Sequence, residues 1–144
     1  KLACGGTLSY PPYKDAGVDL RIGTDGAASS GNGLNLLHEA RLASLVQRHD
    51  HWDSTLLPAK DIFGIATKGS KDWVAWNLDD IRMRPLGRSN NRHLANLVYN
   101  GGDCLDVWVD GQALRLNRET KTVDERATIK ELDLAVSEYY DGVE

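Results

Sequence analysis

Apolar and polar positions along the chain change their spacing several times, and each change marks a predicted element. Apolar residues alternate with polar ones over residues 18–22, which is the period of a half-buried strand. Over about 33–48, Leu34, Leu37, Leu42, Leu45 and Val46 fall on one broad face of a helix and predict that element. A similar stripe predicts a C-terminal helix over about 123–140, which Gly142 ends.

Strand patterns fill the chain between these two helices. Short runs rich in apolar, β-branched and aromatic residues cover 61–69, 72–84, 92–99 and 104–116. Within the last run, Asp110-Gly111 is a strong hairpin signal because a type I′ turn needs positive φ at both central residues. The pattern predicts an α+β fold, with an antiparallel sheet of about five or six strands flanked by the early helix and the C-terminal helix.

Length and composition indicate one globular domain over residues 1–144. The 144 residues are 41% hydrophobic and 26% charged, which is an ordinary globular composition. Pro11-Pro12 predicts an extended N-terminal arm over 1–17. The net charge of −4 disfavours non-specific binding of nucleic acid. No apolar run reaches the roughly 18–20 residues that span a bilayer, so no membrane span is expected.

The two cysteines bear on the compartment. Cys4 and Cys104 are too far apart in sequence for a C-x-x-C redox pair, and a disulfide between them is expected. In the chain-entropy model, closing a loop of about 100 residues stabilises the fold by roughly 4–5 kcal/mol. The alternative is two unrelated thiols. A disulfide would place the protein outside the reducing cytosol.

The first residues offer a second indication of compartment. "LACGG" (residues 2–6) resembles the start of a bacterial lipoprotein around its acylated cysteine, although Lys1 stands where that motif has a leucine. A lipid anchor at Cys4 would compete with the disulfide. Both interpretations predict a secreted or periplasmic protein.

"HDHWD" (residues 49–53) is the most suggestive group of possible metal ligands. Its H-x-H-x-D spacing resembles the metal-binding signature of metallo-β-lactamase-like hydrolases, which implies zinc. In that family the motif follows a buried strand and a histidine comes after the aspartate, whereas here a predicted helix precedes it and Ser54 follows. The favoured interpretation is a polar helix end, because histidine interacts well with the helix dipole there. The alternative is a metal site made by His49, His51, Asp53 and His93.

Two segments are candidates for contact with another molecule. The Gly/Ser-rich loop between the early strand and helix contains Ser29, Ser30, Gly31 and Asn32, but it lacks the lysine and the hydroxyl of a phosphate-binding loop. We expect this loop to enter a cleft of a partner, or else to be a plain surface loop.

The second candidate is a basic segment of twelve residues without an acid. Arginine forks suit carboxylate and phosphate, so this segment is a candidate patch for an acidic partner. Pairing with the acidic C-terminal helix is the alternative. The patch is made by Arg82, Arg84, Arg88 and Arg92.

No coherent catalytic constellation emerges from these patterns. The sequence therefore predicts an extracytoplasmic, non-catalytic domain without a cofactor that binds another protein, as an inhibitor or immunity-type protein does. One alternative is a small secreted hydrolase, metal-dependent or nuclease-like, that uses the HDHWD stretch. The other is a secreted toxin or effector.

Overall fold

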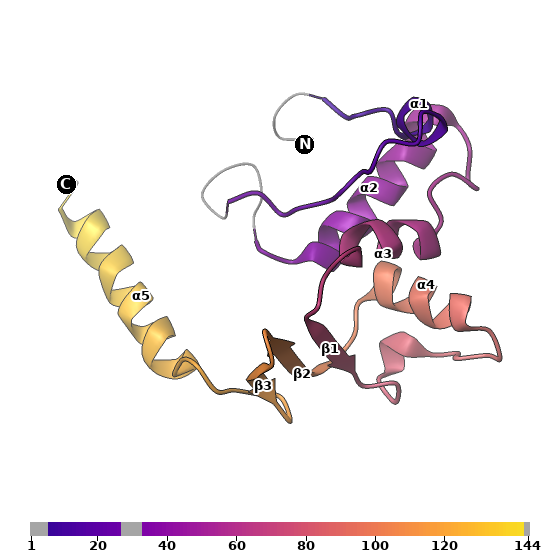
Figure 1. Ribbon diagram of the computed structural model, residues 1–144. Helices are drawn as coiled ribbons and strands as arrows, with labels where there is room; N and C mark the ends of the chain where they lie inside the picture. Colours follow the sequence, from indigo (N-terminus) through magenta and orange to yellow (C-terminus); the bar gives the residue numbers. More distant parts are fainter. Residues whose placement is uncertain (1–5, 27–32, 143–144) are drawn as a thin grey trace. The chain divides into compact units, whose positions relative to one another are not determined.

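The computed structural model describes residues 6–26 and 33–142. These residues form an α+β fold with an antiparallel sheet, as the sequence predicts (Figure 1). The elements in chain order are α1 (Tyr10–Asp15), α2 (Leu36–His51), α3 (Ala59–Thr67), β1 (Trp73–Trp76), the 3-10 turn η2 (Ile81–Met83), α4 (Asn90–Asn100), β2 (Cys104–Val109), β3 (Gln112–Leu116), β4 (Glu119–Thr120) and α5 (Glu125–Asp141).

The chain divides into two compact units. The first unit covers 1–70 and 78–102 and holds α1 to α4 with η2, and the second covers 71–77 and 103–144 and holds the sheet and α5. The prediction of a single domain over 1–144 stays a prediction. None of the described helices is long and apolar enough to cross a bilayer.

Small residues on α2 let the helices of the first unit pack closely. Ala40 and Ser44 lie one turn apart on α2 and both are fully buried. The Ser44 hydroxyl lies 2.7 Å from the backbone oxygen of Leu57, to which it donates, and 2.8 Å from the Tyr99 hydroxyl. Ile62 from α3 belongs to the same core. The polar group of Ser44 is therefore satisfied inside an apolar core, as burial requires.

The early helix is confirmed, with shifted ends. α2 begins after Asn35, whose side chain accepts from the backbone N–H groups of Leu37 and His38 at 3.1 Å. It ends at Trp52, which adopts a left-handed conformation with φ 52°. The N-cap explains why the helix starts a few residues later than the leucine pattern suggests, since a side-chain cap satisfies two of the otherwise unpaired first N–H groups.

Three predicted elements are helices instead. The segment expected as an extended arm contains α1, whose first turn includes Pro11 and Pro12, where proline is tolerated because those N–H groups have no helical partner. The runs at 61–69 and 92–99, expected as strands, lie in α3 and α4. Short apolar runs fit both a buried strand and a buried helix, so periodicity did not separate them.

The second unit contains the sheet, with strand order β1-β2-β3-β4 and antiparallel pairing throughout. The described residues form these four strands, so the expected five or six are not confirmed. Asp110 (φ 48°) and Gly111 (φ 76°) make the predicted turn between β2 and β3. Trp73 on β1 pairs with Trp108 on β2, and their rings stack with centroids 5.2 Å apart.

The C-terminal helix is confirmed as α5. Asp124 caps it by accepting from the N–H groups of Arg126 and Ala127 at 3.0 Å. Its predicted apolar stripe is exposed, with Leu132 at 62% exposure, and α5 has no buried residue.

Candidate functional site

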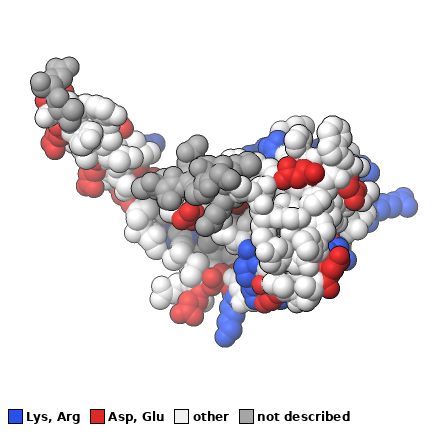
Figure 2. Space-filling view, turned by 90° about the horizontal axis from the view of Figure 1, so that it is seen from above, with Lys and Arg blue, Asp and Glu red and all other residues white. Residues whose placement is uncertain are grey.

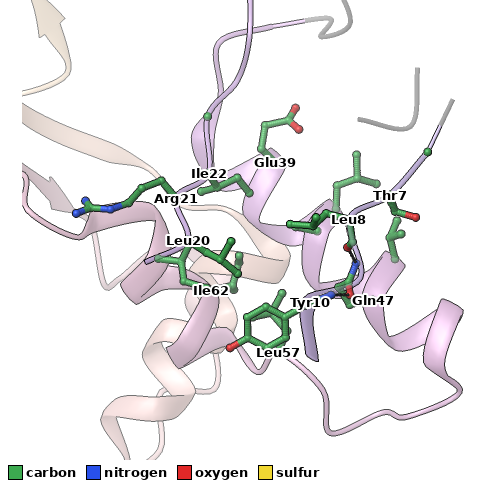
Figure 3. Close-up of a pocket in the computed structure, with 16 residues that line it drawn as sticks. Thr7, Leu8, Tyr10, Leu20, Arg21, Ile22, Glu39, Gln47, Leu57 and Ile62 are labelled. Atoms are coloured by element: carbon green, nitrogen blue, oxygen red, sulfur yellow. Dashed lines mark hydrogen bonds between the residues drawn. The ribbon is translucent and has the colours of Figure 1, made fainter. Parts of the chain in front are cut away.

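An apolar pocket of about 420 Å³ lies in the first unit. Its walls come from the chain before α1, the extended segment after α1, and the facing sides of α2 and α3 (Figure 3). Leu8 and Leu20 line it from the two extended segments, Val46 from α2, and Ile62 and Ile65 from α3. Pockets of this size and apolar character are common binding sites in proteins.

The pocket's first wall is held by Gln47 of α2. Its amide oxygen accepts from the backbone N–H of Tyr10 at 2.7 Å, and its amide nitrogen donates to the backbone oxygen of Leu8 at 2.7 Å. Gln47 is only 5% exposed, so its amide satisfies backbone polar groups that water would not reach. It bonds to this short stretch of backbone as a neighbouring strand would.

The pocket's second wall is the extended segment after α1. The sequence predicts a strand over residues 18–22, but these residues are not part of the four strands that the described residues form. Arg21 donates to the backbone oxygen of Lys68, just after α3, and Asp19 pairs with both the Arg21 guanidinium and the Lys68 ammonium. Hydrogen bonds from Lys68 and then from Arg21 lower the pKa of Asp19 below its ordinary value. This cluster fixes the segment against the C-terminal end of α3.

Asp25 stands at the carboxyl end of this segment in a left-handed conformation, φ 60°. Its Oδ1 accepts from the backbone N–H of Gly26 at 2.8 Å, and the residue is exposed. Asp110 also has positive φ, but the hairpin turn accounts for it. Sequence reasoning did not single out Asp25. An aspartate at the start of the glycine-rich loop that follows the strand pattern was the available signal.

The HDHWD stretch forms the exposed end of α2 and the residues after it. His51 Nε2 lies 3.1 Å from the Ser9 hydroxyl, and His49 Nδ1 lies 3.5 Å from a carboxylate oxygen of Asp50. Asp53 accepts from both the hydroxyl and the backbone N–H of Thr55, and these bonds lower its pKa. The stretch thus lies at the polar end of α2, and the expectation that it binds no metal stays a prediction.

No metal cluster is formed by the parts of the chain that the structure describes. No three histidine, cysteine, aspartate or glutamate side chains come together there. The alternative metal site of His49, His51, Asp53 and His93 is therefore not assembled. His93 lies on α4 with a buried Nε2 that has no hydrogen-bond partner among the described residues.

The arginines of the basic segment have local carboxylate partners. Arg82 pairs with Asp80, and Arg84 donates to Asp79 at 2.6 Å. Arg88 and Arg92 are exposed. Acidic side chains do run along α5 (Figure 2), but the carboxylates that pair with Arg82 and Arg84 are their neighbours in sequence. The role of these arginines in partner binding stays a prediction.

Other predicted residues fall partly outside the described ranges. Ser29, Ser30, Gly31 and Asn32 lie outside the described residues, and so does Cys4. Cys104 begins β2 and is partly buried, and burial raises the pKa of its thiol. The disulfide and the lipid anchor stay predictions.

The chain is similar to known deaminases along most of its length. The 5-methylthioadenosine/S-adenosylhomocysteine deaminase of Bacillus cytotoxicus is 32% identical over 142 residues, which are 88% of this chain and 32% of that protein. The deaminase of the same name from Desulforudis audaxviator is 33% identical over 138 residues, covering 82% of this chain and 31% of that protein. This chain therefore spans about a third of the length of these curated relatives. No protein-family model matches it.

Two solved structures also superpose on most of this chain. An adenosine deaminase from Xanthomonas campestris with bound zinc superposes with a TM-score of 0.76 at 26% identity, over 89% of this chain and 33% of the other. The atrazine chlorohydrolase of Arthrobacter aurescens, complexed with zinc and atraton, superposes with a TM-score of 0.69 at 24% identity, over 88% and 31%. The second likeness concerns the fold alone.

These findings correct the functional prediction. The relatives are enzymes, so they point to a catalytic hydrolase and contradict a non-catalytic inhibitor, immunity protein or toxin. The prediction went wrong because it took the lack of a complete catalytic set in this sequence as evidence against catalysis. The names of the relatives do not support a secreted protein either, and an extracytoplasmic location stays a prediction.

Proposed function

We propose that this chain contributes to a zinc-dependent deaminase that acts on an adenosine-type nucleoside. The observation that carries the proposal is the 32–33% identity to 5-methylthioadenosine/S-adenosylhomocysteine deaminases across more than four fifths of the chain. The superposition on a zinc-containing adenosine deaminase supports the same class of reaction.

The proposed reaction is a hydrolysis at the purine ring. Water adds to C6 of the adenine, the bond from C6 to the exocyclic nitrogen breaks, and ammonia leaves with a proton from that water. The product is the corresponding inosine-type nucleoside, with no change in oxidation state. A bound zinc ion supplies a water of lowered pKa for this class of reaction.

The described residues do not fit a complete zinc site, because no three potential ligands come together among them. A zinc site in the enzyme would therefore draw ligands from residues beyond the described ranges. Of the described carboxylates, Asp25 is the best candidate for a single contribution. It is exposed at the carboxyl end of an extended segment, where ligands bind in many α/β proteins, and its positive φ holds it in a sparsely populated conformation.

The test uses the natural gene product that carries this sequence. We expect it to release ammonia from 5-methylthioadenosine, S-adenosylhomocysteine or adenosine, to lose activity on chelation and to regain it with zinc. A protein that binds zinc stoichiometrically but releases no ammonia from any of the three nucleosides would refute the proposal.

A further inference from the structure

The exposed apolar stripe of α5 has the spacing of a coiled-coil seam. Ile129, Leu132, Val136 and Tyr139 follow one another at intervals of three, four and three residues along one uninterrupted helix (Figure 1). In a heptad labelled a to g they occupy positions a, d, a and d, which fall on one face of a helix. All four side chains are exposed, by between 46% and 68%. We call these four residues the α5 seam.

The described residues leave the α5 seam uncovered. α5 has 17 residues, and none of them is buried. Contacts from the sheet hold its first turn, where the Thr120 hydroxyl donates to the Glu125 carboxylate and Arg115 Nη1 lies 3.4 Å from the same group. An isolated helix of this length is only marginally stable in water, and contiguous exposed apolar surface is typical of an interaction site. A partner that buries the seam would therefore stabilise α5.

The residue types of the seam favour a second copy of the same helix as that partner. Both a positions carry β-branched residues, Ile129 and Val136, and the first d position carries Leu132. β-branched residues at a with leucine at d favour two parallel strands over larger bundles. Two copies of one stripe also match each other about a two-fold axis, which is the commonest symmetry of soluble oligomers.

The polar residues beside the seam favour the parallel arrangement. Asp133 occupies position e in the middle of the seam, and Thr128 occupies the g position before it. In a parallel pair, position e of one helix lies beside position g of the other, so each Asp133 lies beside Thr128 of the second copy. An antiparallel pair that matches the whole seam brings the two e positions together instead. The two Asp133 carboxylates would then repel each other.

These observations assign the α5 seam to self-association. Acidic side chains outnumber basic ones on α5, which disfavours an anionic lipid surface as the occupant. We propose that α5 forms a parallel two-stranded coiled coil with α5 of a second copy, so that two copies of the gene product associate through the α5 seam. This inference concerns assembly and does not depend on the reaction.

Sedimentation of the natural gene product that carries this sequence tests the proposal without an activity assay. We expect it to self-associate. Leu132→Glu places a charge at a d position of the seam and should raise the dissociation constant at least about 30-fold, as the loss of a central interface residue does. Leu134→Glu is the matched control, because Leu134 is an equally accessible leucine of α5 (55% against 62% exposed) at position f, away from the seam. It should change the dissociation constant by less than about threefold.

Cysteine cross-linking of the gene product tests the orientation of the two helices. Under mild oxidation, Leu132→Cys should give a disulfide-linked dimer, because identical d positions face each other in a parallel pair. Leu134→Cys should give no more cross-linked dimer than the unaltered gene product. In an antiparallel pair, position 132 of one helix faces position 136 of the other. Cross-linking would then need a mixture of Leu132→Cys and Val136→Cys.

Three results would overturn the proposal. The first is a gene product that stays monomeric at every concentration measured, which would mean that its own polypeptide covers the seam. The second is self-association that Leu132→Glu leaves intact, which would place the interface elsewhere. The third is cross-linking that is equal in Leu132→Cys and Leu134→Cys, or that needs the mixture with Val136→Cys. Because sedimentation and cross-linking use no substrate, failure of the deaminase proposal is distinguishable from failure of this one.

Discussion

The side-chain oxygen of Gln47 accepts a hydrogen bond of 2.7 Å from the backbone N–H of Tyr10. The same amide donates to the backbone oxygen of Leu8, so one side chain holds the chain on both sides of Ser9. Gln47 is 5% exposed and Tyr10 is 9% exposed. This pair therefore ties the wall of the pocket to α2 through polar contacts that water does not replace easily.

Replacing Gln47 should destabilise the first unit more than replacing an exposed polar residue of the same helix. Gln47→Leu keeps a side chain of similar size but removes the amide, which leaves the Tyr10 N–H without its partner. We expect a loss of about 1–3 kcal/mol in the free energy of unfolding, measured by urea denaturation. Arg41→Leu, on the exposed side of the same helix, is the control and should change stability by no more than about 0.5 kcal/mol. Equal losses in the two variants would contradict this account.

The loss of stability on truncating an aliphatic residue of the first unit should depend on how deeply that residue is buried. Ile62 is 2% exposed and belongs to the core, whereas Leu45 is 43% exposed on α2. We expect Ile62→Ala to cost about 2–5 kcal/mol, because it leaves a cavity that the neighbours only partly fill. Leu45→Ala should cost less than about 1 kcal/mol. A similar unfolding midpoint for both variants would show that the core is elsewhere.

The ion pairs at Asp19 predict that the stability of the fold depends on pH. Bonds from Lys68 and then Arg21 lower its pKa in the folded protein below the ordinary value of 3.8. A carboxyl group with a lowered folded pKa stabilises the fold above its unfolded pKa, and that contribution disappears as the pH falls through the folded pKa. Carboxyl titration by NMR should give a midpoint below 3.8. In Lys68→Gln the midpoint should move upward, and an unchanged midpoint would exclude the Lys68 contact.

Zinc content should distinguish the two candidate regions for metal binding. In the natural gene product, Asp25→Asn keeps the size of the side chain but removes a charged ligand. We expect its zinc affinity to fall at least tenfold, since changes even behind the ligands cost about 10–100-fold. His51→Ala is the comparison, because His51 lies at an exposed helix end beside Ser9, and it should retain the zinc of the unaltered protein. Zinc loss in His51→Ala alone would reverse the assignment.

The sequence was informative where a local signal has one structural meaning. Asp110-Gly111 correctly located the hairpin between β2 and β3, because few residues accept positive φ in succession. The spacing of leucines and the stripe near the C-terminus located α2 and α5. These features depend on neighbours along the chain, which a sequence displays directly.

The sequence was misleading where tertiary packing decides. α3 contains Ile62, Phe63 and Ile65, residues that favour strands, and yet they form the helix that packs on α2. Two start signals were missed, namely Pro58 directly before α3 and Ser89 directly before α4. A helix that buries one face overrides the weak strand preference of its residues.

The candidate site was harder to predict than the fold. The chain matches only about a third of its relatives, and the described residues bring no three metal ligands together. A motif search within the sequence could therefore find only isolated polar groups such as His49 and His51. Asp25 carries no motif by itself, and its left-handed backbone appears only in three dimensions.

The most direct test of the central claim is the mass of the nucleoside product formed in water enriched in heavy oxygen. The natural gene product with zinc is incubated with 5-methylthioadenosine in that water. Hydrolytic deamination predicts a product in which one solvent oxygen has replaced the exocyclic nitrogen, together with an equal amount of ammonia. Recovery of unaltered nucleoside from a zinc-loaded protein, with S-adenosylhomocysteine and adenosine unaltered as well, would contradict the account.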